Sequence, residues 1–196
     1  VPEFAFYLPG MGGNLSFSLG NKTKTISLNN AATIECRYRP GARIYNITDP
    51  LLGKGKIVIT ALAMSAAEGL ILKVETKNIP SKLNLSWVFG GASGKRFSRN
   101  GDLGVDPIDS FELKPEYCTG NVYTLNDNTF HLLFGAKKNS EMIGTFPPSA
   151  KLTTTNAEAP VLKANMKLKN NTTYYIGIQI PSNVKSLNYA SLPSIF

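Results

Sequence analysis

The sequence is poor in the residues that build most metal and catalytic sites. Its 196 residues include one histidine, two cysteines and one tryptophan, and 17% of them are charged. Neither Cys36 nor Cys118 has the CxxC partner that structural zinc sites use, and no second histidine can pair with His131. We therefore expect no metal, no cofactor and no complete set of catalytic residues. The cysteines could form a disulfide or remain as buried thiols, and the sequence leaves both open.

Uninterrupted apolar runs long enough to cross a membrane are missing as well. The longest candidate, IVITALAMSAAEGLILKV at residues 57–74, is broken by Ser65, Glu68 and Lys73. Two adjacent buried strands joined by a turn explain this run better than a helix across a bilayer. In that turn, Gly69 is expected to supply the positive φ angle that hairpin loops need. We expect no membrane span.

Acidic residues are outnumbered, with 13 of them against 21 lysines and arginines, so the net charge is +8. The basic residues are spread from Lys22 to Lys185 and do not form a tract. The chain also lacks the basic helix or the aromatic-rich motif that marks many nucleic-acid-binding domains. The pattern indicates a solvated basic surface and no nucleic-acid partner. A weaker alternative is a surface that binds polyanions in a strongly salt-dependent way.

Helical periodicity is nearly absent, and strand-like segments recur instead. They are separated by clusters of Gly, Asn and Pro at intervals of about ten residues, as in β-sandwiches. The segments are FAFYL, NLSFSLG, TKTISLN, TIECRYR, ARIYNIT, KIVITALAM, LILKVETK, LNLSWVFG, TFHLLFG, VLKANMKLK and TYYIGIQI. Two runs, IVITALAM and YYIGIQI, are continuously apolar, which predicts strands covered on both faces. The sequence therefore predicts an all-β, two-layer antiparallel β-sandwich of about a dozen strands with little helix.

One long segment, FGGASGKRFSRNGDLGVDPIDSFELKPEYC at residues 89–118, combines glycines, basic residues and carboxylates. It does not fit a phosphate-binding loop, because the spacing of Gly90 and Gly94 departs from GxxxxGK[ST] and no helix pattern follows Lys95. Its aspartates lack the ligand spacing of a calcium-binding EF-hand, so turn formation is the default interpretation and a bound cation the alternative. Its carboxylates could serve acid-base chemistry, but the sequence gives no distances between them.

Carbohydrate binding is a further interpretation of the same region. Sugar sites use aromatic faces together with a few polar groups that fix orientation. Trp87 stands inside a strand pattern, so it is either a core residue or a binding platform. The candidates for carbohydrate binding or for a domain interface are Trp87, Lys95, Arg96, Phe97, Arg99, Asp102, Asp106 and Tyr117.

Three blocks of the sequence resemble one known family. They are PEFAFYLPGMGGNLSFSLG at residues 2–20, YRPGARIYNITDPLLGKG at residues 38–55, and the long segment at residues 89–118. The chain resembles the N-terminal β-sandwich domain of secreted glycan-metabolising proteins of gut Bacteroidetes, which is classed as a domain of unknown function. That domain is similar to the supersandwich, galactose-mutarotase-like domains that precede (α/α)6 six-hairpin glycosidase barrels.

The resemblance implies a domain organisation and a role. Residues 1–180 would form the sandwich, and residues 181–196 would be a linker or C-terminal extension toward a further domain. The role implied is that of a non-catalytic accessory domain of a secreted or periplasmic glycoside hydrolase. Such a domain would pack against the (α/α)6 catalytic domain of the same chain and shape it, with residues 95–109 facing that domain or its cleft. The alternative is an autonomous carbohydrate-binding module with a polysaccharide as its partner.

Overall fold

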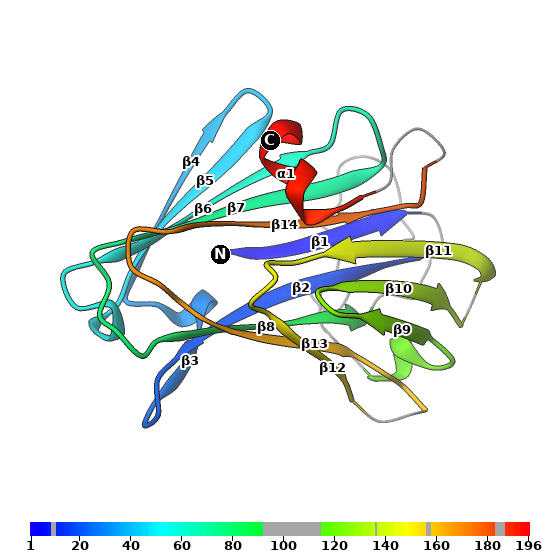
Figure 1. Ribbon diagram of the computed structural model, residues 1–196, viewed down its shortest axis with the longest axis horizontal. Helices are drawn as coiled ribbons and strands as arrows, with labels where there is room; N and C mark the ends of the chain where they lie inside the picture. The colour runs from blue at the N-terminus through cyan, green and yellow to red at the C-terminus, as the bar shows by residue number, and fades with distance from the viewer. Residues whose placement is uncertain (9–10, 92–114, 136, 156–157, 183–186) are drawn as a thin grey trace, which may run out of the picture.

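The computed structural model describes residues 1–8, 11–91, 115–135, 137–155, 158–182 and 187–196. These residues form two antiparallel sheets that face each other, so the predicted all-β sandwich is confirmed (Figure 1). The helical elements described are short: η1 (Leu28–Asn30), η2 (Pro50–Leu52), η4 (Pro115–Cys118), η5 (Tyr189–Ser191) and α1 (Leu192–Ile195).

The smaller sheet, sheet A, has six strands in the order β1-β2-β8-β13-β12, with β3 paired to β2. Its strands are β1 (Glu3–Leu8), β2 (Met11–Gly20), β3 (Thr25–Ser27), β8 (Asn84–Gly91), β12 (Lys151–Thr154) and β13 (Leu162–Lys167). Side chains alternate along β13: Leu162, Ala164 and Met166 are buried, whereas the residues between them are exposed. Sheet A therefore has one apolar face, which must be covered, and one solvated face.

The larger sheet, sheet B, has eight strands in the order β4-β5-β6-β7-β14-β11-β10-β9. Its strands are β4 (Thr33–Arg39), β5 (Ala42–Thr48), β6 (Lys56–Ala63), β7 (Gly69–Lys77), β9 (Val122–Asn126), β10 (Thr129–Phe134), β11 (Lys137–Thr145) and β14 (Thr173–Gln179). The edge strand β4 is exposed at all but one of its positions. Strand β4 thus presents both of its faces at one edge of the sandwich, whereas β5 buries Tyr45 and Ile47 (Figure 1).

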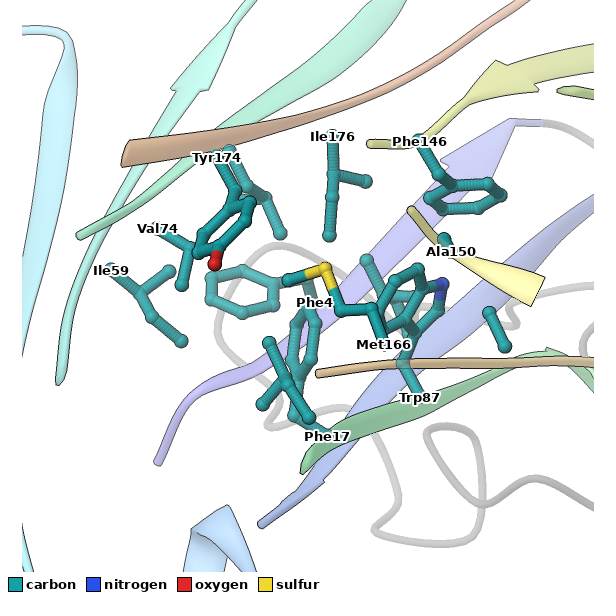
Figure 2. Packing of buried hydrophobic residues seen from close by; sticks show 14 of the residues in the cluster. Phe4, Phe17, Ile59, Val74, Trp87, Phe146, Ala150, Met166, Tyr174 and Ile176 are labelled. Atoms are coloured by element: carbon teal, nitrogen blue, oxygen red, sulfur yellow. The ribbon is translucent and has the colours of Figure 1, made fainter. Parts of the chain in front are cut away.

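Aromatic side chains fill the space between the two sheets. Phe4 on β1 meets Tyr45 on β5 edge-on, with their ring centroids 5.7 Å apart. Trp87 on β8 packs against Phe146, which follows β11, with centroids 5.2 Å apart. Figure 2 shows Trp87 with Phe146 and Met166 beside it, inside the cluster of buried side chains. Such ring pairs add about 0.5–1.5 kcal/mol each beyond the apolar area that they bury.

The β6–β7 hairpin confirms that residues 57–74 form two adjacent strands. The role predicted for Gly69 is wrong, because Gly69 is not among the described residues with a positive φ angle. The position needs glycine for space. A Cβ atom there would lie 2.7 Å from Gln179 Cβ and 2.7 Å from Met64 Sδ, well inside contact distance. At the β9–β10 turn Asp127 takes the left-handed conformation, with a φ angle of 49°.

The C-terminal residues, 187–196, pack on the outer face of sheet B, the face that points away from sheet A. Leu192 is fully buried there against Met64 and Ile71, and these residues form a second apolar cluster. Phe196 meets Tyr175 of β14 with ring centroids 5.8 Å apart. The prediction that part of the sheet is covered on both faces is therefore confirmed. This segment packs along the side of the domain (Figure 1).

Candidate functional site

The segment with most of the predicted site residues leaves sheet A at the end of β8 and reaches η4. Lys95, Arg96, Phe97, Arg99, Asp102 and Asp106 lie outside the described residues, so the structure does not place them. The base of the segment is described. Strand β8 ends between β2 and β13, and η4 packs against it.

Trp87, the first predicted candidate, is a core residue. Its side chain is 1% exposed and packs against Phe17 of β2 as well as Phe146. Both faces of the indole are covered by protein, so it offers no platform for a sugar. This was the other interpretation of the position, and the alternation along β8 is the reason: Leu85, Trp87 and Phe89 all face sheet B.

The base of the segment is tightly packed around Cys118. The Cys118 side chain is fully buried, and a Cβ atom on Gly90 would lie 3.2 Å from its Sγ. The phenol of Tyr123 on β9 donates a hydrogen bond of 3.2 Å to the carbonyl oxygen of Phe89. Burial, reinforced by the neighbouring Cys118, raises the pKa of Tyr123 and keeps the phenol neutral. These contacts tie η4, β8 and β9 into a fixed frame.

Tyr117 lies on this frame, next to Cys118 in η4, and is partly buried. Of the predicted candidates, Trp87 and Tyr117 are the two among the described residues, and η4 contacts β8, the strand that carries Trp87. The two side chains differ in burial, because Trp87 points into the core whereas Tyr117 is partly buried on η4.

The two cysteines lie in different surroundings. Cys36 is exposed on the edge strand β4, whereas Cys118 is buried at η4, and no disulfide joins the two described cysteines. Two thiols in such different surroundings differ in accessibility, so only Cys36 is open to reagents in solution.

His131, the single histidine, lies on the outer face of β10 and forms a surface pair. Its Nε2 lies 2.9 Å from Oε2 of Glu141, and the two side chains are 39% and 43% exposed. A pair this open to solvent contributes little to stability. Within the described parts of the chain, no group of three or more His, Cys, Asp or Glu side chains is arranged to hold a metal ion.

The structure also shows two hollows that sequence reasoning missed. A groove of about 340 Å³ lies on the outer face of β4, β5 and β6, and its lining residues are Thr33, Glu35, Arg37, Asn46, Thr48 and Lys56. A pocket of about 170 Å³ lies beside the C-terminal segment, lined by Met64, Ser65, Ala66, Ala67, Gln179, Ser182, Ser194 and Ile195. The alternation of polar residues along TIECRYR was the available signal for the groove. The pocket depends on packing between distant segments, which left no local signal.

No described helix has both the length and the apolar character needed to cross a membrane. A family model described as "Domain of unknown function (DUF4450)" matches residues 8–196. A search of curated protein sequences finds no match.

Two solved structures share the fold at low sequence identity. A bacterial glucoamylase complexed with acarbose aligns with a TM-score of 0.53 and 10% identity, over 96% of this chain and 32% of the glucoamylase chain. A putative kojibiose phosphorylase from the human microbiome aligns with a TM-score of 0.51 and 10% identity, over 94% of this chain and 25% of that protein. The chain thus spans about a third or less of the length of these proteins.

Proposed function

The chain belongs to the DUF4450 family, a domain of unknown function, and we propose that it is a non-catalytic accessory domain of a larger glycoside-processing enzyme. The observation that carries the proposal is the fold match. Nearly the whole chain aligns with one part of a glucoamylase and of a putative kojibiose phosphorylase, each about three or more times longer than the aligned segment.

The proposed role is structural support of a catalytic domain. The sandwich would pack beside a helical (α/α)6 catalytic domain of the same chain and shape its substrate cleft, as the sequence resemblance implies. The frame of η4, β8 and β9 supports this role, because the two described ends of the long connecting segment, β8 and η4, pack together beside β9. A secreted or periplasmic location is part of the same proposal.

The described chemistry agrees with a supporting role. An accessory domain needs a stable core, and the aromatic contacts between the sheets stabilise the core of this one. Catalysis of glycoside hydrolysis needs two carboxyl groups held across the scissile bond. Of the candidates for that task in this chain, Asp102, Asp106, Asp109 and Glu112 lie outside the described residues, and Glu116 is an exposed side chain of η4.

An activity assay tests the proposal directly. The purified 196-residue chain, incubated with starch, xylan, polygalacturonate and mucin glycans, should release no reducing sugar above a heat-denatured control. Robust turnover by this chain would overturn the non-catalytic role. The coding sequence beyond Phe196 gives an independent check, since we expect it to encode a long series of helical hairpins.

A further inference from the structure

The described arginines gather on one hairpin. Arg37 and Arg39 lie on β4 and Arg43 lies on β5, and these are all the arginines within the described residues. Along the sequence the basic residues look scattered. Arginine differs from lysine in its planar fork of donors, which matches the two oxygens of a carboxylate. The three do not share one face: Arg37 and Arg39 alternate with Tyr38 along β4, whereas Arg43 pairs with Tyr38 and lies on the face of the buried Tyr45. The face that carries Arg37 and Arg39 is therefore the one suited to bind carboxylates.

Strand register assigns these side chains to faces. Glu35 pairs with Asn46, and Asn46 pairs with Val58, so these positions share the outer face of sheet B. Arg37 lies two residues from Glu35 and projects to the same face. At the next row Thr33 pairs with Thr48, and Lys56 pairs with Lys77 of β7. Strand register thus brings the residues that line the groove, from β4, β5 and β6, onto one face of sheet B.

The groove is polar throughout and cationic on balance. Its lining consists of two cations, one carboxylate, one amide and two hydroxyls, with no apolar side chain. The lining carboxylate, Glu35, pairs with Arg37 at 3.9 Å, but the two side chains are 62% and 75% exposed. An exposed pair of this kind is weak, so a ligand carboxylate can take the place of Glu35 beside the guanidinium.

The chemistry of the lining selects among polymeric ligands. A protein partner normally buries an apolar centre, and this groove has none. Neutral sugars are usually held by an aromatic face, which the lining also lacks. A polar chain that carries carboxylates satisfies both conditions, because Arg37 and Lys56 can bind its charges while Asn46 and the threonines bind its hydroxyls. A volume of about 340 Å³ is at the lower end for ligand sites.

We propose that the outer-face groove of β4, β5 and β6 binds a segment of acidic polysaccharide, with uronate carboxylates placed at Arg37 and Lys56. This inference goes beyond the supporting role proposed above. A domain could support a catalytic partner without binding glycan, and it could bind glycan without such a partner. The C-terminal segment covers the other end of the same face, around Leu62 and Ile71, so it leaves the groove open.

Titration calorimetry with polygalacturonate tests the proposal. We expect the Arg37→Gln/Lys56→Gln double variant to bind at least about tenfold more weakly than the wild type, as the loss of charge-assisted hydrogen bonds predicts. The matched control is Lys163→Gln/Lys167→Gln, which removes the same charge from exposed positions on sheet A and should leave binding unchanged. If both double variants weaken binding equally, net charge alone is responsible and the proposal fails.

Neutral changes provide the second arm. Asn46→Leu keeps the charge but removes the amide from the lining of the groove, and we expect it to weaken binding as well. Fully methyl-esterified polygalacturonate lacks the free carboxylates and should bind poorly to the wild type. Absence of binding to polygalacturonate would overturn the proposal. So would tighter binding of heparin or of poly-L-glutamate, which would indicate a sulfate or an acidic-peptide site. Circular dichroism of each variant verifies that the sandwich is intact.

Discussion

Trp87 shows that a tryptophan, a residue common in binding sites, can function only in packing the core. The indole lies between the two sheets, and its Nε1 atom has no hydrogen-bond partner among the residues that the structure describes. An unsatisfied buried donor costs free energy. The contacts of a ring this large offset that cost, since Trp87 touches the rings of Phe17 on β2 and of Phe146, which follows β11.

Tyr123 packs against the same core from β9 and, unlike Trp87, its polar atom has a partner, the carbonyl oxygen of Phe89. Burial raises its pKa, whereas an unfolded tyrosine titrates near pH 10. Tyr123 therefore loses its phenol proton at a lower pH in the unfolded chain than in the folded chain. The stability that the protonated, buried phenol contributes is fully present below about pH 10 and is lost as the pH rises further.

The Tyr123→Phe variant should show both effects. At pH 7 we expect a loss of about 1 kcal/mol in the free energy of unfolding, because the hydrogen bond to Phe89 is removed. Between pH 9 and pH 11 its stability should fall less steeply than that of the wild type, by an amount set by the missing phenol. Urea denaturation at each pH measures both quantities. Tyr45 and Tyr189, whose pKa values burial also raises, leave a residual slope in the variant. An unchanged slope would contradict the assignment.

At the scale of the element, the C-terminal segment behaves as part of the sandwich. Its short helix α1 places Leu192 over β14, close enough that a Cβ atom on Gly177 would lie 2.7 Å from Leu192 Cδ2. Glycine at position 177 thus lets the segment approach the sheet. The helix is too short to be stable by itself, so its conformation depends on this contact.

Leu192→Ala tests how much this contact contributes. The side chain is fully buried, so we expect a loss of about 2–5 kcal/mol in the free energy of unfolding, from lost burial and the cavity left behind. Ser194→Ala, an exposed change in the same helix, should stay within about 0.5 kcal/mol of the wild type. Equal and small effects for the two variants would show that the segment is loosely attached. Urea denaturation followed by circular dichroism provides the measurement.

The elements also show what a sequence can predict. The segments TIECRYR and ARIYNIT coincide with β4 and β5, because alternation and clear turn residues define them. Strands β9, β11 and β12 were not predicted. KLTT of β12 is short and polar, and KKNSEMIGT of β11 is interrupted by charges and by Gly144. That glycine belongs to the strand because the ring of Phe130 on β10 occupies the space of its missing side chain, a contact between strands that no local pattern reveals.

The candidate site was predictable only where it depends on local sequence. The unusual composition of residues 89–118 marked a segment that departs from β8, and its described base at η4 agrees with that interpretation. The outer-face groove was missed because its residues come from three strands. Thr33, Thr48 and Lys56 look like ordinary surface residues until the register places them in neighbouring rows. Functional surfaces on a sheet arise from pairing, which a single sequence does not specify.

At the scale of the whole molecule, one continuous core joins the two sheets. The main cluster of buried residues takes Leu15 and Leu85 from sheet A and Ile59 and Leu132 from sheet B. Neither sheet can bury this face without the other, so the sandwich should unfold as a unit. This expectation is worth testing, because chains longer than about 150 residues often depart from two-state behaviour.

The single tryptophan makes the test direct. Trp87 fluorescence reports the environment between the sheets, whereas far-UV circular dichroism reports the total strand content. We expect the two signals to give the same midpoint in urea. In Leu192→Ala the midpoints should move together, although the substituted residue lies on the opposite face of sheet B from Trp87, because loss of the C-terminal contact destabilises the one cooperative unit. A shift of the circular dichroism midpoint alone would show that sheet B with its C-terminal segment unfolds separately, and the single-core description would then be wrong.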